Sequence, residues 1–444
     1  MRSIIQKVNG GLKNKLIKNI ILVGGITFGV KVLSFFKETE VAASFGLSIF
    51  LDTFLIAILI PNFIQQVFIG SLNSLFIPNY IIEEKSSKQL GSFQSVSLIS
   101  ILGIVTILCV VTLVFSQFFL ESVFPDHTME YYQLVRNQIY IVLPCIFFWG
   151  FASFGNALLE IEGHFFLSKI TLAYPPLVTL LSLFYFRDFF GDYVLAYSML
   201  IGSVLSFSHL IFFVWRKKLI TISKIEINQN IREMMRQYPP KVTSGLLTGI
   251  NPFVDQFFAA QLAIGSIAAI NYGIKIPSFI ISIVMVALSN VLLPHFSRAI
   301  ATNLEKAFKQ LKKLWGVTFL GALVICALLI FFSSDIIALF FERKEFTSED
   351  TVIVSKIQII FLLHVPFYLC TLITVRFLTA LNKNKFMAWL SFFNLILNLV
   401  LNFIFIKYFE VYGLVLSTTI VYIIASFFYV GYAIRLSKKE VGNS

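Results

Sequence analysis

Long apolar runs separated by short polar stretches fill almost the whole of this 444-residue chain. A helix needs about 20 predominantly apolar residues to cross a bilayer, and twelve runs reach that length. The expected spans are residues 17–45, 50–80, 92–124, 132–159, 165–186, 192–215, 240–264, 268–298, 314–341, 352–381, 386–406 and 411–434. The pattern predicts an all-α polytopic membrane protein with about twelve transmembrane helices.

One block of the second span recurs in the eighth. "IPNFIQQVFIGSLNSLFIPNY" and "IPSFIISIVMVALSNVLLPHF" align without gaps at an offset of 216 residues, which pairs Pro61 with Pro277 and Pro78 with Pro294. A proline inside a helix removes one backbone hydrogen bond and allows a bend. We therefore expect two six-helix lobes, related as parallel repeats around a central cavity, with Pro61 and Pro277 as hinges.

The longest polar connection, "RKKLITISKIEINQNIREMMRQYPP", falls near the middle of the chain. Its composition is basic, and we expect it to include a short surface helix. It divides the sequence into an N-terminal six-span lobe (1–215), a cytoplasmic linker (216–239) and a C-terminal six-span lobe (240–444).

Composition and charge agree with a membrane setting. Hydrophobic residues make up 57% of the chain and charged residues 13%, against roughly 25% charged residues in soluble domains. Of the 35 Lys and Arg residues, 25 fall in segments on the side of the N-terminus, six on the opposite side and four within spans. The positive-inside rule then places both termini in the cytoplasm. The net charge of +12 reflects this topology and gives no argument for nucleic-acid binding.

Enzyme and metal chemistry find no support in the sequence. The four cysteines lie in apolar runs, the five histidines are scattered, and no nucleotide-binding loop or catalytic grouping is recognisable. We expect a transporter rather than an enzyme, with no cofactor and no metal.

Ionisable residues inside spans are the candidate functional groups, because a charge in the bilayer is costly unless it faces protein or water. They are Lys31, Lys37, Glu38, Glu40, Asp52, Asp255, Lys275 and Arg376. Lysines from both lobes would make a cationic cavity suited to a phosphate-bearing substrate. Helical spacing places Lys31 and Glu38 on one face and makes Lys37 and Glu40 neighbours. Alternatives remain for all but Asp52: Lys37, Glu38 and Glu40 as a rim that pairs with itself, Lys31 as a structural pair with Glu38, Lys275 and Arg376 as snorkelling side chains, and Asp255 as a structural hydrogen-bonding group.

Several stretches resemble the MurJ/MviN lipid II flippases of the MOP transporter superfamily. They are "KVLSFFKETEVAASFG", "LDTFLIAILIPNFIQQVF", "SLFIPNY" and "AAQLAIGSIAAINYGIKIPSFIISIVMVALSNVLLPHFSR". The resemblance implies a multi-pass protein of the bacterial cytoplasmic membrane. It would translocate an undecaprenyl-diphosphate-linked saccharide by alternating access, for cell-wall or surface-polysaccharide biogenesis.

The resemblance also implies site residues. Lys31 and Lys37 match the basic positions of span one in that family, Lys275 matches the one in span eight, and Asp52 matches the acidic start of span two. These four are the expected substrate-binding residues, and Asp255 and Glu38 are candidates for ion coupling.

The sequence departs from the family pattern in three respects. Lysine stands where arginine predominates, Gln65 and Gln66 replace an expected basic pair, and twelve spans are found where fourteen are usual, without the two (13–14) that line a groove for the lipid tail. Twelve is the usual count of the related O-antigen and capsule flippases.

Two other transport functions therefore remain open at this point. One is an O-antigen or capsule repeat-unit flippase, and the other is a cation-coupled multidrug antiporter of the same superfamily, which should have an acidic, aromatic cavity. The expected partners are a polyprenyl-diphosphate-linked glycan, membrane lipid and glycan-polymerising proteins, with the chain itself a monomer.

Overall fold

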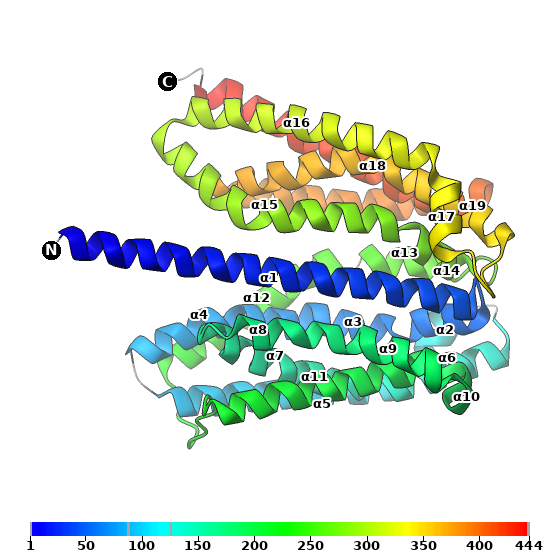
Figure 1. Ribbon diagram of the computed structural model, residues 1–444, viewed down its shortest axis with the longest axis horizontal. Helices are drawn as coiled ribbons and strands as arrows, with labels where there is room; N and C mark the ends of the chain where they lie inside the picture. Colours follow the sequence, from blue (N-terminus) through cyan, green and yellow to red (C-terminus); the bar gives the residue numbers. More distant parts are fainter. Residues whose placement is uncertain (1, 87–88, 125–126, 250, 442–444) are drawn as a thin grey trace. The chain divides into compact units, whose positions relative to one another are not determined.

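The computed structural model describes residues 2–86, 89–124, 127–249 and 251–441, and helices make up nearly all of them. The chain forms two compact units. Unit 1 comprises Met1–Val41 and Thr53–Ile250, and unit 2 comprises Ala42–Asp52 and Asn251–Ser444. Figure 1 labels the helices in chain order, and each unit is described separately below.

Unit 1 contains the helices up to α12. They are α1 (Arg2–Phe45), α2 (Ile49–Ala57), α3 (Leu59–Ile64), the π-helix η1 (Gln65–Ile69), α4 (Gly70–Ser86), α5 (Leu90–Val123), α6 (Met129–Val142), α7 (Cys145–Ile161), α8 (Phe165–Lys169), the 3-10 helix η2 (Ile170–Ala173), α9 (Tyr174–Tyr185), α10 (Arg187–Phe190), the 3-10 helix η3 (Gly191–Tyr193), α11 (Val194–Arg216) and α12 (Gln229–Gly249). The end of α1 and the start of α2 lie in unit 2.

Unit 2 contains the remaining helices. They are α13 (Asn251–Ala259), α14 (Ser266–Gly273), α15 (Lys275–Thr302), α16 (Leu304–Phe331), α17 (Ser333–Phe341), α18 (Ser348–Ala380) and α19 (Asn384–Val441). A left-handed residue, Glu410 (φ 48°), interrupts α19 and joins two of the expected spans.

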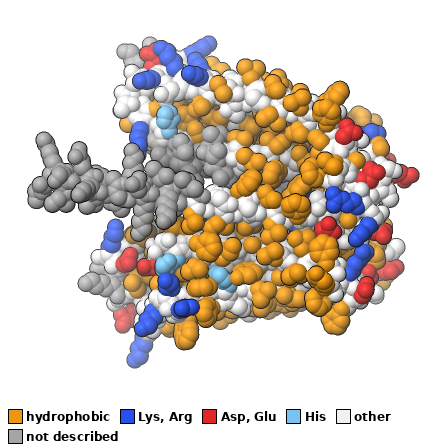
Figure 2. Space-filling model, in the orientation of Figure 1, with side chains coloured by type: hydrophobic (Ala, Val, Ile, Leu, Met, Phe, Trp, Pro, Cys, Tyr) orange, Lys and Arg blue, Asp and Glu red, His pale blue; other side chains and the backbone are white. Residues whose placement is uncertain are grey.

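The expected membrane architecture is confirmed. Within the described residues, nine helices are long and apolar enough to cross a membrane. They account for ten of the expected spans, because α19 contains two. The other two expected spans correspond to α1 and to the pair α12 and α13. Helices such as α5 and α16 expose Val, Leu and Phe side chains along their length, and Figure 2 shows such hydrophobic side chains over the flanks of the helices. These flanks suit contact with lipid.

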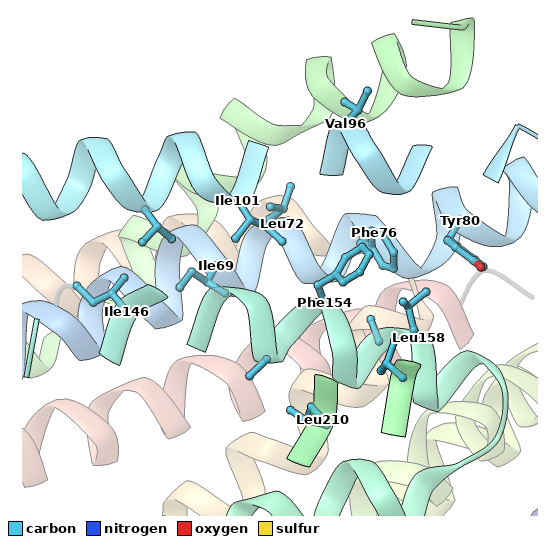
Figure 3. Close-up of a cluster of buried hydrophobic side chains, with 14 of the residues drawn as sticks. Ile69, Leu72, Phe76, Tyr80, Val96, Ile101, Ile146, Phe154, Leu158 and Leu210 are labelled. Carbon is cyan, nitrogen blue, oxygen red and sulfur yellow. The ribbon is translucent and has the colours of Figure 1, made fainter. Parts of the chain in front are cut away.

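An apolar core holds unit 1 together. Side chains from η1, α4, α5, α7 and α11 interdigitate, and the ring of Phe76 lies 5.2 Å from that of Phe154 and 5.5 Å from that of Phe93 (Figure 3). Close helix approach needs a residue without a side chain: a Cβ on Gly202 would lie 2.7 Å from the Cα of Pro175. Small residues at helix contacts serve this purpose in membrane bundles.

A helix break precedes both repeated blocks at the same position. A turn residue, Ile58, separates α2 from α3, and Ile274 separates α14 from α15 at an offset of 216 residues. The cause is the proline three residues later, since Pro61 and Pro277 have no N–H to donate to the carbonyl four residues earlier. The flanking hydrogen bonds also match: Asn62 N to Ile58 O and Ser278 N to Ile274 O are both 2.9 Å. Each proline is therefore preceded by a break in its helix, and the hinge role stays a prediction.

The boundaries of the two units differ from the lobe boundaries that charge and hydropathy predicted. The expected C-terminal lobe began at 240, yet α12 packs against α4 and η1 of unit 1. The hydroxyl of Tyr238 on α12 donates to the Phe68 carbonyl of η1 at 3.3 Å. The linker is also not one surface helix: residues 219–228 have no regular secondary structure, and α12 begins only at Gln229.

Candidate functional site

The charges of span one lie together on α1 in unit 1. Lys37 forms an ion pair with Glu38, N to O 2.5 Å, and both side chains are largely shielded from solvent. Lys37 thus pairs with its sequence neighbour, rather than meeting Glu40 on the face that the helical spacing suggested. Lys31 is half-buried and makes no ion pair within the described residues. Lys31 therefore has no counter-charge among the side chains that the structure describes.

A polar stripe follows span two on α3, η1 and α4. Asn62, Gln65, Gln66 and Ser74 are exposed, and their spacing places them on one helical face. The opposite face, with Ile64, Val67 and Leu72, is buried in the core of unit 1. A span with an exposed amide face is suited to protein or water rather than to lipid. The π-helix falls on the two glutamines, and such irregular turns are frequent at functional sites.

Asp52 is buried in unit 2, where it caps a helix. Its Oδ2 accepts a hydrogen bond from the Gly265 N–H at 2.6 Å, and its Oδ1 accepts one from the Ala268 N–H at 2.8 Å. The N-cap residue of α14, Gly265, has no side chain for this purpose. Asp52 therefore supplies the negative charge that a helix N-terminus favours. Its predicted contact with substrate has to be weighed against this structural contact.

Lys275 is the first residue of α15 in unit 2, directly after the break at Ile274. The side chain is half-buried, while its neighbours Ile276 and Pro277 are buried. The role of Lys275 in binding a phosphate group stays a prediction.

An apolar groove of about 230 Å³ in unit 2 ends on Arg376. Its other lining residues are Val284, Met285, Leu292, Leu369, Leu372 and Ile373, from α15 and α18. The guanidinium group forms no ion pair within the described residues. The sequence left Arg376 open between a functional and a snorkelling role, and it gave no indication of the groove.

Asp255, on α13 of unit 2, lies among oxygen-bearing side chains of α19. Its carboxylate accepts hydrogen bonds from Asn402 Nδ2 at 3.2 Å and from Thr418 Oγ1 at 3.4 Å. The same amide of Asn402 donates to Asn398 Oδ1 at 3.2 Å, while the buried Asn402 Oδ1 has no hydrogen-bond partner within the described part of the chain. Both a structural network and a hard-cation site use oxygen atoms of this kind.

The structure thus brings together only some of the predicted residues. Lys31, Lys37 and Glu38 share α1 in unit 1, whereas Asp52, Asp255 and Lys275 belong to unit 2. No group of three or more His, Cys, Asp or Glu residues that could hold a metal ion occurs in the described residues.

Comparison with known proteins gives the family. Residues 41–442 match the family model described as "Lipid II flippase MurJ". The chain belongs to the MurJ family. Curated relatives named "Probable lipid II flippase MurJ" include one from Buchnera aphidicola subsp. Schizaphis graminum, 27% identical over 91% of this chain and 80% of the relative. Another, from Aquifex aeolicus, is 24% identical over 76% of this chain and 67% of the relative.

Solved structures agree with this MurJ-family assignment. One titled "Lipid II flippase MurJ, inward closed conformation" superposes with a TM-score of 0.81, at 26% identity over 94% of this chain and 87% of that one. An inward-facing multidrug resistance MATE transporter of the MOP superfamily gives a TM-score of 0.74 at 16% identity, over 94% and 96%. The second likeness concerns the fold alone. The MurJ-family chain is a multi-pass protein of the bacterial inner membrane and a transporter rather than an enzyme.

Proposed function

We propose that this chain translocates lipid II, or a closely related undecaprenyl-diphosphate-linked saccharide, from the cytoplasmic to the outer leaflet by alternating access. The match to the MurJ family over residues 41–442 carries the proposal. The O-antigen or capsule flippase and the multidrug antiporter are not favoured, since the curated relatives cited above are named lipid II flippases and the MATE likeness is one of fold.

The residues of each unit support an anionic substrate. Unit 1 presents Lys31 on a span, where it forms no ion pair with any residue that the structure describes, and unit 2 carries Lys275 at the start of α15. In this scheme the lysines bind the diphosphate as point charges. Lys37 contributes less net charge than the sequence suggested, because Glu38 is paired with it.

The matched helix breaks supply the movement in this proposal. A helix broken at Ile58 or Ile274 can change its bend without losing further backbone hydrogen bonds, because proline has already removed one. Pro61 and Pro277 are the proposed hinges. The return of the empty transporter to its starting conformation would use a cation or a proton bound among the oxygen atoms around Asp255. One elementary charge moved across 100 mV corresponds to about 2.3 kcal/mol, or roughly fifty-fold in a two-state equilibrium.

Transport of fluorescent lipid II by purified protein in liposomes tests the proposal. Lys31→Ala and Lys275→Ala should each reduce transport at least tenfold, and both should fail to complement a flippase-depleted strain. Lys309→Ala is the matched control, because Lys309 is exposed on α16 and pairs only with Glu305 one turn away. Full transport by both variants would refute the assigned roles. Saturable binding of cationic drugs without lipid II transport would refute the function itself.

The remaining proposals concern partners and orientation. Both termini are proposed to lie in the cytoplasm, which the distribution of Lys and Arg supports, and the protein is proposed to act as a monomer alongside glycan-polymerising proteins. Protease protection of tagged termini in sealed vesicles and crosslinking in cells test these two points.

A further inference from the structure

The segment between α11 and α12 is held along α5 of unit 1 by side chains. Gln94 bonds both the Leu219 carbonyl, at 2.9 Å, and the Thr221 N–H, at 2.8 Å. Two serines repeat the pattern further on. Ser95 bonds the carbonyl and N–H of Ser223 at 2.9 and 3.2 Å, and Ser92 bonds those of Glu226 at 2.9 and 2.8 Å. Three α5 side chains therefore satisfy backbone donors and acceptors of a segment that has no regular secondary structure of its own.

Two further features fix the position of this segment. A Cβ on Gly91 would lie 2.7 Å from Ser223 Oγ and 3.0 Å from the Thr221 carbonyl, so glycine permits the close approach to α5. At the far end, the buried carboxylate of Glu83 accepts hydrogen bonds at 2.8 Å from the amides of both Asn228 and Asn230. The segment is thus a defined part of unit 1 rather than a loose linker.

Fixing the backbone leaves one set of side chains facing outward. Leu219 and Ile220 pack against the core of unit 1, whereas Ile222, Ile225 and Ile227 are 68%, 51% and 53% exposed. Basic residues accompany these isoleucines: Arg216, Lys217, Lys218 and Lys224 are all exposed. The one acidic side chain among them, Glu226, accepts a hydrogen bond from Gln89 at 2.9 Å. The outward face is therefore both apolar and cationic.

The position along α5 places this face at the edge of the membrane. Ile99 and Leu102 of α5 are 55% and 47% exposed and begin its lipid-facing stretch. Ser95 and Ser92 precede Ile99 by four and seven residues, which is about 6 and 10 Å along a helix. The headgroup layer of a bilayer is about 5–8 Å thick on each side. The segment therefore lies at the depth of lipid headgroups.

We propose that residues 215–227 form a docking strip for anionic phospholipid in the leaflet at the Lys- and Arg-rich end of the molecule. Lys217, Lys218 and Lys224 bind the headgroup phosphates, and the three isoleucines, together with the 74% exposed Trp215, enter the boundary with the acyl chains. Tryptophan is enriched at this level of membrane proteins. The strip is independent of the transported substrate, because it binds lipid of the surrounding leaflet.

Fluorescence quenching in the full-length protein tests the strip. The four native cysteines are free and buried, so a dye attached to Ile225→Cys reports one site. In liposomes of phosphatidylcholine with 30% phosphatidylglycerol, spin-labelled lipid should quench the dye and aqueous iodide should not. Ile99→Cys serves as the lipid-facing reference. Glu84→Cys, an exposed residue of α4, serves as the aqueous reference.

Charge variants separate anion recognition from simple apolar insertion. Replacing Lys217, Lys218 and Lys224 by Gln should restore iodide quenching, and native mass spectrometry should show about fivefold weaker phosphatidylglycerol binding per lysine removed. The matched control replaces Lys306, Lys312 and Lys313 of α16 by Gln and should leave the signal unchanged. If iodide quenches the dye on Ile225→Cys as strongly as the dye on Glu84→Cys, the proposed docking strip is refuted. Equal lipid quenching without phosphatidylglycerol would overturn the anionic assignment.

Discussion

The cap formed by Asp52 allows a substrate contact and a structural contact to be distinguished. Asp52→Asn keeps the shape of the side chain but leaves one oxygen for two backbone donors, the N–H groups of Gly265 and Ala268. A buried donor without a partner costs about 1–3 kcal/mol, and the remaining bond loses its charge assistance, worth about 1 kcal/mol. We expect a total loss of about 2–4 kcal/mol in the stability of unit 2.

The loss should be measurable as a lower unfolding temperature. Unit 2 contains 11 residues from Ala42–Asp52 and 194 from Asn251–Ser444, 205 in total. For a unit of this size, 1 kcal/mol corresponds to about 2–4 °C, so the midpoint should fall by about 4–16 °C. A thiol-reactive dye provides the assay, because the free cysteines are buried and react only on opening. Mass mapping should show Cys326 and Cys370 of unit 2 reacting before Cys109 and Cys145 of unit 1.

The matched control is Asp335→Asn, since Asp335 occupies the first turn of α17 but is exposed. Exposed substitutions of this kind usually change stability by no more than about 0.5 kcal/mol. An unchanged midpoint for Asp52→Asn, combined with weaker lipid II binding, would refute the capping argument and favour the substrate contact predicted from sequence.

Three other variants test separate parts of the structure. Gly265→Ala should lower the unfolding midpoint strongly, because φ is +93° and a Cβ would lie 2.7 Å from the Leu47 carbonyl. Gly163 has φ +78° and open space around it, so Gly163→Ala should lose only about 1–2 kcal/mol of stability from backbone strain. Equal shifts of the unfolding midpoint for Gly265→Ala and Gly163→Ala would refute the predicted clash with Leu47. Glu83→Gln should speed tryptic cleavage after Lys224, since one amide of the Asn228 and Asn230 pair loses its acceptor. Glu84→Gln, at an exposed position, should leave the cleavage rate unchanged. An unchanged rate for Glu83→Gln would refute the role of Glu83 in holding the segment. Asp255→Asn should abolish the dependence of transport on Na⁺ or on the proton gradient, whichever liposome experiments with exchanged cations reveal. Retention of that dependence would exclude Asp255 as the coupling group.

Much of the architecture followed from patterns that act locally along the chain. Apolar length predicted the spans, and the two prolines predicted the breaks before Pro61 and Pro277, because a missing N–H acts on the carbonyl four residues away. The linker was less predictable. Ser92, Gln94 and Ser95, more than a hundred residues earlier in the chain, accept from and donate to its backbone, so an irregular segment stands where a surface helix was expected.

The candidate site was harder to predict for the same reason. The hydrogen-bond donors to Asp52 lie 213 and 216 residues away in the chain, and no local sequence pattern indicates them. Helical spacing favoured pairs such as Lys37 with Glu40, yet Lys37 bonds the adjacent Glu38. Side-chain rotamers decide such choices among close neighbours, and sequence spacing carries no information about them.

The polar groups within the spans therefore fall into two sets. Asp52 and Asp255 accept hydrogen bonds within unit 2, and Lys37 and Glu38 form an ion pair within unit 1. Lys31 and Arg376 form no ion pair within the described residues, although a charge within the bilayer requires a partner or water. Contacts within the fold explain the polar groups of the first set without any substrate. They do not explain the charges of the second set. We therefore expect substitutions of Lys31 and Arg376 to weaken binding of the diphosphate while leaving the unfolding midpoint unchanged. Asp52 should show the opposite behaviour, so measuring both quantities for each variant separates the two sets.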